Sequence, residues 1–133
     1  MSEADVELTR DQFEAVNQRD FERAMNLYAD DVVLVVSRDS GPNPGTYEGK
    51  EAVGNWFGDW FQMFGRDYRF TIEEARELGD RVFIFASHTG RGRASGAEVH
   101  GENAYLYKVR DGKIAGVEFY ATRDDALEAA GVE

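Results

Sequence analysis

The sequence predicts an α+β fold: three N-terminal helices packed in the concave face of a strongly curved, mostly antiparallel sheet, a cone-shaped barrel, followed by a short C-terminal helix. In the first half of the chain, apolar residues recur at three- and four-residue steps, whereas strand-like segments separated by turn residues fill the second half. The chain has 133 residues, of which 42% are hydrophobic, enough for one core and too few for two ordinary domains. Because the helices precede the strands, they should cover one face of the sheet, and a strongly bent sheet leaves a conical cavity. We expect a single domain over residues 1–133.

Two helices and a strand are expected at the N-terminus. Residues 5–19 carry their apolar side chains on one helical face, and Asp20 follows in the position of an N-cap for a second helix. The apolar stripe of this second helix runs over residues 21–28, and the acidic pair at 30–31 ends it. The next segment, 32–36, is continuously apolar and mostly β-branched, which predicts a strand covered on both faces.

A loop and a third helix follow this strand. Residues 37–49, SRDSGPNPGTYEG, contain both prolines of the chain and several glycines, which predicts a loop. Residues 50–64 are expected to form a helix that Gly65 ends. The apolar side chains of this helix form a wide aromatic stripe, made of Val53, Trp56, Phe57, Trp60, Phe61 and Phe64.

Four strands and a short helix complete the prediction. Glycine-containing turns separate the strands at hairpin distances. The expected strands are 67–78, 81–93, 97–109 and 113–122, and the closing DDALEAAG is expected to be a short helix at the end of the sheet.

The charge balance argues against several kinds of partner. With 26 acidic against 15 basic residues, the net charge of -11 repels nucleic acid and anionic membrane surfaces. The absence of cysteine excludes disulfides, thiolate metal sites and cysteine nucleophiles. The acidic start MSEADVELTRDQF lacks the basic and apolar regions of a signal peptide, and no apolar run approaches membrane-spanning length. We expect a cytoplasmic protein without metal or cofactor.

Several phrases resemble one known superfamily. DFERAMNLYADDVVLVV, GTYEGKEAVGNWF, RDGKIAGVEFY and RDDALEAAG are similar, in this order, to the nuclear transport factor 2-like superfamily, in particular its SnoaL-like branch. The resemblance implies a fold that hosts polyketide cyclases, steroid isomerases, dehydratases, epoxide hydrolases and many proteins without an established activity. Fold therefore does not settle function.

The catalytic residues of ketosteroid isomerase do not carry over. The resemblance places Val36 where the aspartate base stands and Gln12 where the tyrosine stands, and the protonated aspartate falls near Tyr105. A steroid-isomerase mechanism is therefore not expected. Asp39, three residues after Val36, is the acid in this neighbourhood that could replace the base.

Strand alternation divides the sheet into an inner and an outer face. With a turn centred near Ala94-Ser95, the predicted inner set is Phe83, Phe85, Ser87, Thr89, Arg91, Val99, Asn103, Tyr105 and Tyr107. A three-residue loop in the last hairpin adds Val117 and Phe119, whereas a two-residue loop would add Glu118 and Tyr120. We prefer the first because it unites apolar residues. His88 and His100 then lie on the outer face, His88 near Glu102 and Tyr120, either as an acid-base pair with a carboxylate or as a contact in a dimer.

A pocket for a small apolar organic ligand follows from these faces, with few polar groups in an apolar cavity. The residues expected to line it are Tyr28, Trp56, Phe57, Trp60, Phe85, Ser87, Val117 and Phe119. Those expected to act in general acid-base catalysis are Asp39, Asn103, Tyr105 and Arg91. The alternative interpretation is core packing for the aromatic residues, hydrogen bonding to the backbone or to one another for the buried polar residues, and solvation for Arg91.

Three functions stay open at this point. The first is a cofactor-independent isomerase, cyclase or dehydratase, which needs a titratable group in the cavity. The second is a noncatalytic ligand-binding domain, and the third is an interaction module with a filled cavity. A homodimer is expected through the apolar outer face, made of Val82, Ile84, Ala86, Ala104 and Leu106.

Overall fold

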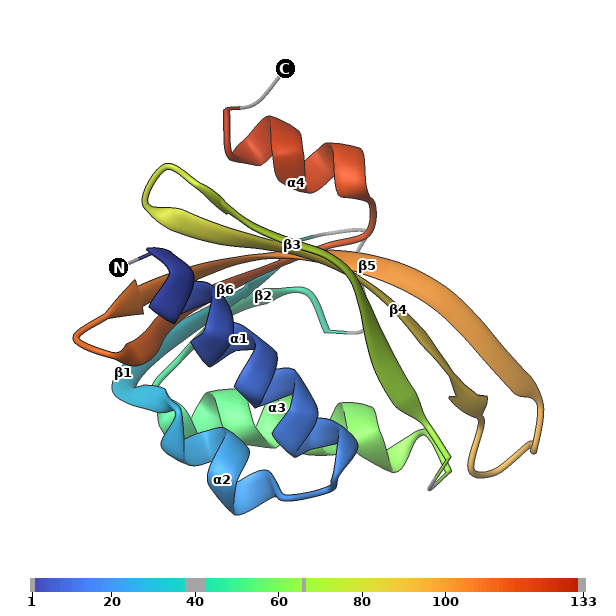
Figure 1. The fold of residues 1–133 in the computed structure, drawn as a ribbon. Helices are drawn as coiled ribbons and strands as arrows, with labels where there is room; N and C mark the ends of the chain where they lie inside the picture. The colour runs from blue at the N-terminus through green and yellow to red at the C-terminus, as the bar shows by residue number, and fades with distance from the viewer. Residues whose placement is uncertain (1, 38–42, 66, 132–133) are drawn as a thin grey trace.

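Three helices lie on one side of a curled sheet and a fourth lies on the other side (Figure 1). The computed structural model describes residues 2–37, 43–65 and 67–131. The helices are α1 (Ser2–Asn17), α2 (Phe21–Asn26), α3 (Lys50–Gln62) and α4 (Arg123–Ala129). The predicted α+β class is confirmed, and none of the helices in the described ranges is long and apolar enough to cross a membrane.

The sheet has six strands in the order β2-β1-β6-β5-β4-β3. The strands are β1 (Tyr28–Val36), β2 (Gly45–Glu48), β3 (Arg69–Leu78), β4 (Arg81–Arg91), β5 (Glu98–Arg110) and β6 (Lys113–Tyr120). β1 and β6 pair in parallel, and all other neighbours pair antiparallel. The sheet therefore curls around α1–α3 without closing, with β2 and β3 at its edges (Figure 1).

The N-terminal elements differ from the prediction where a helix meets the sheet. The Asp20 side chain accepts a hydrogen bond from the Arg23 N–H, which confirms the predicted N-cap. However, α2 ends at Asn26, because pairing with β6 draws the next residues into β1, beginning with Tyr28 opposite Ile114. Tyr28 and the acidic pair after it thus belong to a strand and not to a helix.

β1 is covered on one face only, contrary to the prediction. Val32, Leu34 and Val36 are buried against the helices, whereas Val35 is 37% exposed on the outer face. The expected loop after β1 contains β2, which pairs antiparallel with β1 and forms the edge of the sheet. Its Tyr47 side chain explains this placement, because the ring packs against Trp56 of α3.

The predicted inner face of β4 is wrong by one residue. Ile84 pairs with Tyr105 and Ala86 with Asn103, so the even-numbered residues of β4 share the inner face with the odd-numbered residues of β5. A shift of one residue moves every side chain of a strand to the opposite face. The residues that consequently lie on the outer face are Phe83, Phe85, Ser87, Thr89 and Arg91. In the last hairpin the preferred faces are confirmed, because Tyr105 pairs with Phe119 on the inner face. The predicted three-residue loop is wrong, because Arg110 pairs with Lys113 across the two residues Asp111 and Gly112, and a register shift between Lys108 and Val109 restores the inner position of Val117 and Phe119.

The outer face is less open than expected. Val82, Ile84 and Ala86 belong to the inner core. Ala104 and Leu106 do face outward, but they pack under α4 in a second apolar cluster with Phe83 and Ala126. The first residue of α4, Arg123, holds the helix in place by donating two hydrogen bonds to the Glu74 carboxylate of β3.

Candidate functional site

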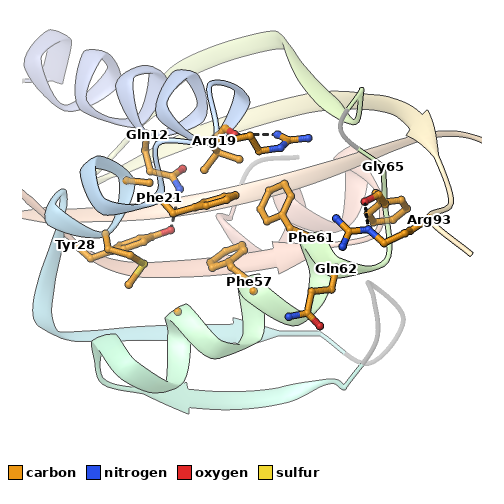
Figure 2. A pocket seen from close by; sticks show the side chains of 15 residues that line it. Gln12, Arg19, Phe21, Tyr28, Phe57, Phe61, Gln62, Gly65 and Arg93 are labelled. Atoms are coloured by element: carbon orange, nitrogen blue, oxygen red, sulfur yellow. Dashed lines mark hydrogen bonds between the residues drawn. The ribbon is translucent and has the colours of Figure 1, made fainter.

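A cavity of about 720 Å³ lies between α1, α2 and α3, and its lining is mostly apolar (Figure 2). This volume is within the range of pockets that bind drug-sized molecules. Fifteen residues line the cavity: Gln12, Val16, Arg19, Phe21, Ala24, Met25, Tyr28, Gly54, Phe57, Gly58, Phe61, Gln62, Phe64, Gly65 and Arg93.

Helix α3 presents different faces to the core and to the cavity. One face places Val53, Trp56 and Trp60 against the sheet, and all three are buried. The neighbouring face lines the cavity with residues spaced three and four apart, namely Gly54, Phe57, Gly58, Phe61 and Gln62. The predicted aromatic stripe is thus divided between core packing and a cavity wall.

The two glycines of the α3 wall keep the cavity open. A Cβ atom at Gly58 would meet no other atom within 4 Å, and one at Gly54 would lie 3.2 Å from the Met25 methyl carbon. Glycine in a helix interior costs about 1 kcal/mol relative to alanine. The two glycines therefore leave space beside Phe57 and lower the stability of α3.

A hydrogen-bonded chain of side chains forms the inner end of the cavity. The Tyr107 hydroxyl donates to Gln12 Oε1 at 3.3 Å, and Gln12 Nε2 donates to the Tyr28 hydroxyl at 3.0 Å. Because the Tyr28 oxygen accepts this bond, its own proton is available for an acceptor in the cavity. Burial raises the pKa of Tyr28 well above its ordinary value, so the hydroxyl stays protonated at neutral pH.

Two arginines line the other parts of the cavity. Arg19 Nη1 donates to the Val16 carbonyl at 3.0 Å, and its guanidinium carbon lies 5.4 Å from the centre of the Phe61 ring. Arg93 Nε donates to the Phe64 carbonyl at 3.3 Å. None of the described lining residues is an aspartate, a glutamate or a histidine.

A second polar cluster is buried between α3 and the sheet. Trp60 Nε1 donates to the Tyr68 hydroxyl at 3.0 Å, and that hydroxyl lies 3.0 Å from His88 Nδ1. Because the Tyr68 oxygen has two lone pairs, it pairs with Nδ1 as donor or as acceptor according to the tautomer of His88. Burial lowers the pKa of His88, and the Asn103 side chain opposes this shift.

This cluster corrects the predicted position of His88. The imidazole lies on the inner face and is buried, so it forms no pair with Glu102 on the outer face. Gly101 makes room for it, because a Cβ atom there would lie 2.8 Å from His88 Nε2. Trp56 Nε1 is buried without a hydrogen-bond partner among the described residues, and the buried Asn103 Oδ1 interacts with His88 without forming a hydrogen bond of good geometry.

The structure distributes the predicted pocket residues over three places. Tyr28 and Phe57 line the cavity. The buried core beside it takes in Trp56, Trp60, Val117 and Phe119. Phe85 and Ser87 lie on the opposite face of the sheet, where Phe85 packs with the cluster under α4 and the Ser87 hydroxyl donates to Glu73.

The predicted acid-base residues are not brought together. Asn103 and Tyr105 are buried on the inner face and do not line the cavity. Arg91 is exposed at the end of β4, and Asp39 lies outside the described residues. Among the residues that the structure describes, no three metal-ligating side chains of His, Asp or Glu lie together.

Sequence reasoning missed Gln12, Arg19, Arg93 and Gly58 as cavity residues. The resemblance marks Gln12 only as a replacement for a catalytic tyrosine, and in the structure it holds a tyrosine hydroxyl instead. Gly54 and Gly58 carried a usable signal, because isolated glycines inside a helical pattern usually have a packing or functional reason. The two arginines carried none, since the folding of the loops that position them is not visible in a linear pattern.

The fold and the cavity together define an architecture in which a curled sheet and three helices enclose an apolar pocket. The SnoaL-like domain matches residues 9–117 of the chain. The chain therefore belongs to the SnoaL-like family, as its resemblance predicted. Among curated proteins, none matches this sequence.

Solved structures with the same fold come from several bacteria. A proposed SnoaL-like polyketide cyclase from Jannaschia sp. CCS1 superposes with a TM-score of 0.79 at 18% identity, over 98% of this chain and 92% of that chain. A hypothetical protein with a ketosteroid isomerase-like fold from Catenulispora acidiphila, in complex with trimethylamine, gives 0.73 at 21% identity, over 96% and 94%. RV0760c from Mycobacterium tuberculosis, in complex with estradiol-17beta-hemisuccinate, gives 0.74 at 22% identity, over 93% and 97%. At these identities the similarity shows a shared fold.

Proposed function

We propose that this protein binds a small apolar molecule that carries a hydrogen-bond acceptor, such as a carbonyl oxygen, in the cavity between α1, α2 and α3. The observation that carries the proposal is the buried Tyr28 hydroxyl at the inner end of an apolar cavity. Gln12 and Tyr107 hold this hydroxyl so that its proton can be donated only away from Gln12. Apolar walls with few fixed polar groups are typical of a ligand site.

Noncatalytic ligand binding agrees with the lining better than general acid-base catalysis does. Catalysis of an isomerisation or dehydration needs a base beside the acid, and the described lining offers neither a carboxylate nor an imidazole. Tyr28, with its pKa raised by burial, is suited to donate a hydrogen bond and not to accept a proton. Catalysis is the second candidate, because a fixed tyrosine donor can polarise a carbonyl group. Its base would have to be Asp39 or another group outside the described residues.

The experiment is a ligand titration on wild type and on two tyrosine variants. Tryptophan fluorescence and melting temperature are recorded with polyketide-like, steroid-like and terpenoid compounds, with and without a ketone. We expect a ketone to raise the melting temperature, and Tyr28→Phe to weaken its binding by about 3- to 10-fold, the worth of one neutral hydrogen bond. Tyr47→Phe is the control, because Tyr47 lies outside the cavity lining and its hydroxyl donates to the Asn43 carbonyl. Equal binding to wild type and Tyr28→Phe would contradict the proposal.

A homodimer through the outer face and a cytoplasmic location remain predictions. The apolar area available to a partner is smaller than expected, because α4 covers Ala104 and Leu106. The outer surface that α4 leaves uncovered includes a shallow depression over β1, β6 and β5. Val33 and Val35 line it together with the Arg81–Glu118 ion pair. A second copy would cover Val35, which is otherwise 37% exposed.

A further inference from the structure

The charge of the cavity lining is opposite in sign to that of the whole chain. The chain has a net charge of -11. The described lining contains two arginines and neither an aspartate nor a glutamate. The acidic surface of the protein repels anions at long range, whereas the positive charge in the cavity attracts them at short range. This arrangement favours a ligand that carries an anionic group.

Both arginines are positioned by the fold. Arg19 follows α1 with a left-handed backbone conformation (φ 62°), and its side chain donates to the carbonyls of Val16 and Tyr68. Arg93 is fixed at its backbone, where its N–H donates to the Met63 carbonyl at 2.9 Å, and at Nε, which donates to the Phe64 carbonyl. These bonds leave the terminal nitrogens of Arg93 on an exposed side chain beside the cavity.

Arg93 and the tyrosine hydroxyl lie at different ends of the cavity, and the Arg19 guanidinium lies beside Phe61. Figure 2 shows Arg93 at the end opposite Tyr28, with Phe57 and Phe61 between them. Asp67 flanks this end without lining the cavity, and its carboxylate acts electrostatically on Arg19. A bound anion near Arg19 therefore competes with the Asp67 carboxylate.

We propose that the ligand of this cavity is an elongated amphipathic anion. Its carboxylate or sulfonate contacts Arg93 and Arg19, and its apolar body lies along Phe57 and Phe61. Guanidinium groups bind such anions by charge-assisted hydrogen bonds, often in pairs. This inference rests on the proposed function, since it names the chemical class of the molecule bound there.

The test compares two fluorescent probes that share one skeleton. Anilinonaphthalene sulfonate carries an anionic group, whereas phenylnaphthylamine is the same ring system without it, and both become bright in an apolar site. Energy transfer from the tryptophans to the bound probe reports occupancy, because Trp56 packs against the cavity residue Phe57 at 5.1 Å between ring centres. Dissociation constants are measured for wild type, Arg93→Gln, Arg93→Glu and Arg91→Gln. Arg91 is the matched control, an exposed arginine two residues away that does not line the cavity.

We expect Arg93→Gln to weaken the sulfonate about fivefold and Arg93→Glu to weaken it more, the scale of a partly exposed charge contact. The neutral probe should change by less than about twofold in every variant. Arg91→Gln should leave both probes unchanged, and equal melting temperatures would exclude unfolding as the cause. Equal losses for Arg91→Gln and Arg93→Gln, or no loss in either, would overturn the inference. Binding of the neutral probe in that case would still show that the cavity takes an apolar molecule, and the Tyr28→Phe titration would decide the proposed function. Failure of both probes to bind wild type would overturn both proposals.

Discussion

Replacing Gly58 with leucine tests whether the cavity beside α3 is the binding site, because this change adds volume without removing a contact. A Cβ atom at Gly58 meets nothing within 4 Å, so the backbone of α3 can accept a side chain there. Gly58 lies four residues from Gly54 and one from Phe57, on the helix face that lines the cavity. The leucine side chain should therefore occupy space that the ligand needs.

The expected changes in melting temperature and in ligand affinity distinguish a blocked cavity from an unfolded protein. Replacing a glycine inside a helix by alanine or leucine contributes about 1 kcal/mol to stability, which raises the melting temperature of a chain of this size by about 3 °C. Overfilling a site costs about 1–3 kcal/mol, which weakens ligand binding by roughly 5- to 150-fold. Gly58→Ala is the control, because it gives the same helical gain with little added volume.

The assay is thermal unfolding with and without the ketone identified by titration, together with its dissociation constant. We expect both variants to melt above the wild type and only Gly58→Leu to lose ligand binding. A Gly58→Leu protein that melts higher and still binds like wild type would refute the assignment of the cavity. A lower melting temperature for Gly58→Ala would refute the placement of Gly58 in an open helix interior.

Two further predictions concern the buried histidine and the oligomeric state. The pKa of His88 is lowered in the folded protein, whereas in the unfolded chain the imidazole takes up a proton near its ordinary pKa of about 6.5. Protons therefore bind more readily to the unfolded chain, and the free energy of unfolding falls as the pH decreases from 7 toward 5.5. Urea unfolding across this range should show a shallower decline for His88→Gln than for wild type, and equal slopes in the two proteins would contradict the burial argument. Light scattering at micromolar concentration should give twice the chain mass and Val35→Glu should halve it, while a monomeric wild type would rule out the dimer.

The order and type of the elements could be predicted because periodicity is a local property. The apolar residues of 50–62 recur at helical spacing, which predicts α3. The turns around Gly79 and Gly112 separate strands whose ends were predicted to within a few residues. The faces of β4 could not be predicted in the same way. Its inner and outer residues are all apolar from Val82 to Ala86, so the pattern fits both registers, and the turn before β5 decides between them.

The cavity was predicted less well than the fold because its residues meet only in three dimensions. Tyr28 was placed in the pocket as part of a helical stripe, yet it reaches the cavity from the first residue of β1. Trp56 and Trp60 have the spacing of a ligand wall and are instead the core under that wall. A helix face that packs on a sheet and one that lines a pocket have the same composition, apart from the glycines that leave the pocket empty.

The replacement of Tyr by Gln at position 12, seen against the ketosteroid isomerase pattern, does not remove a phenol from the cavity. Gln12 holds the Tyr28 hydroxyl at 3.0 Å, and Tyr107 orients Gln12 from the sheet, so the phenolic donor comes from β1 instead of α1. Val36, in the position of the base, is buried and apolar. On the proposed function, the Tyr28 hydroxyl donates to a ligand carbonyl, whereas Val36 cannot accept a proton. A donor without a carboxylate or an imidazole among the described lining residues favours binding over turnover, which is why a ligand's affinity is a sharper first measurement than its conversion.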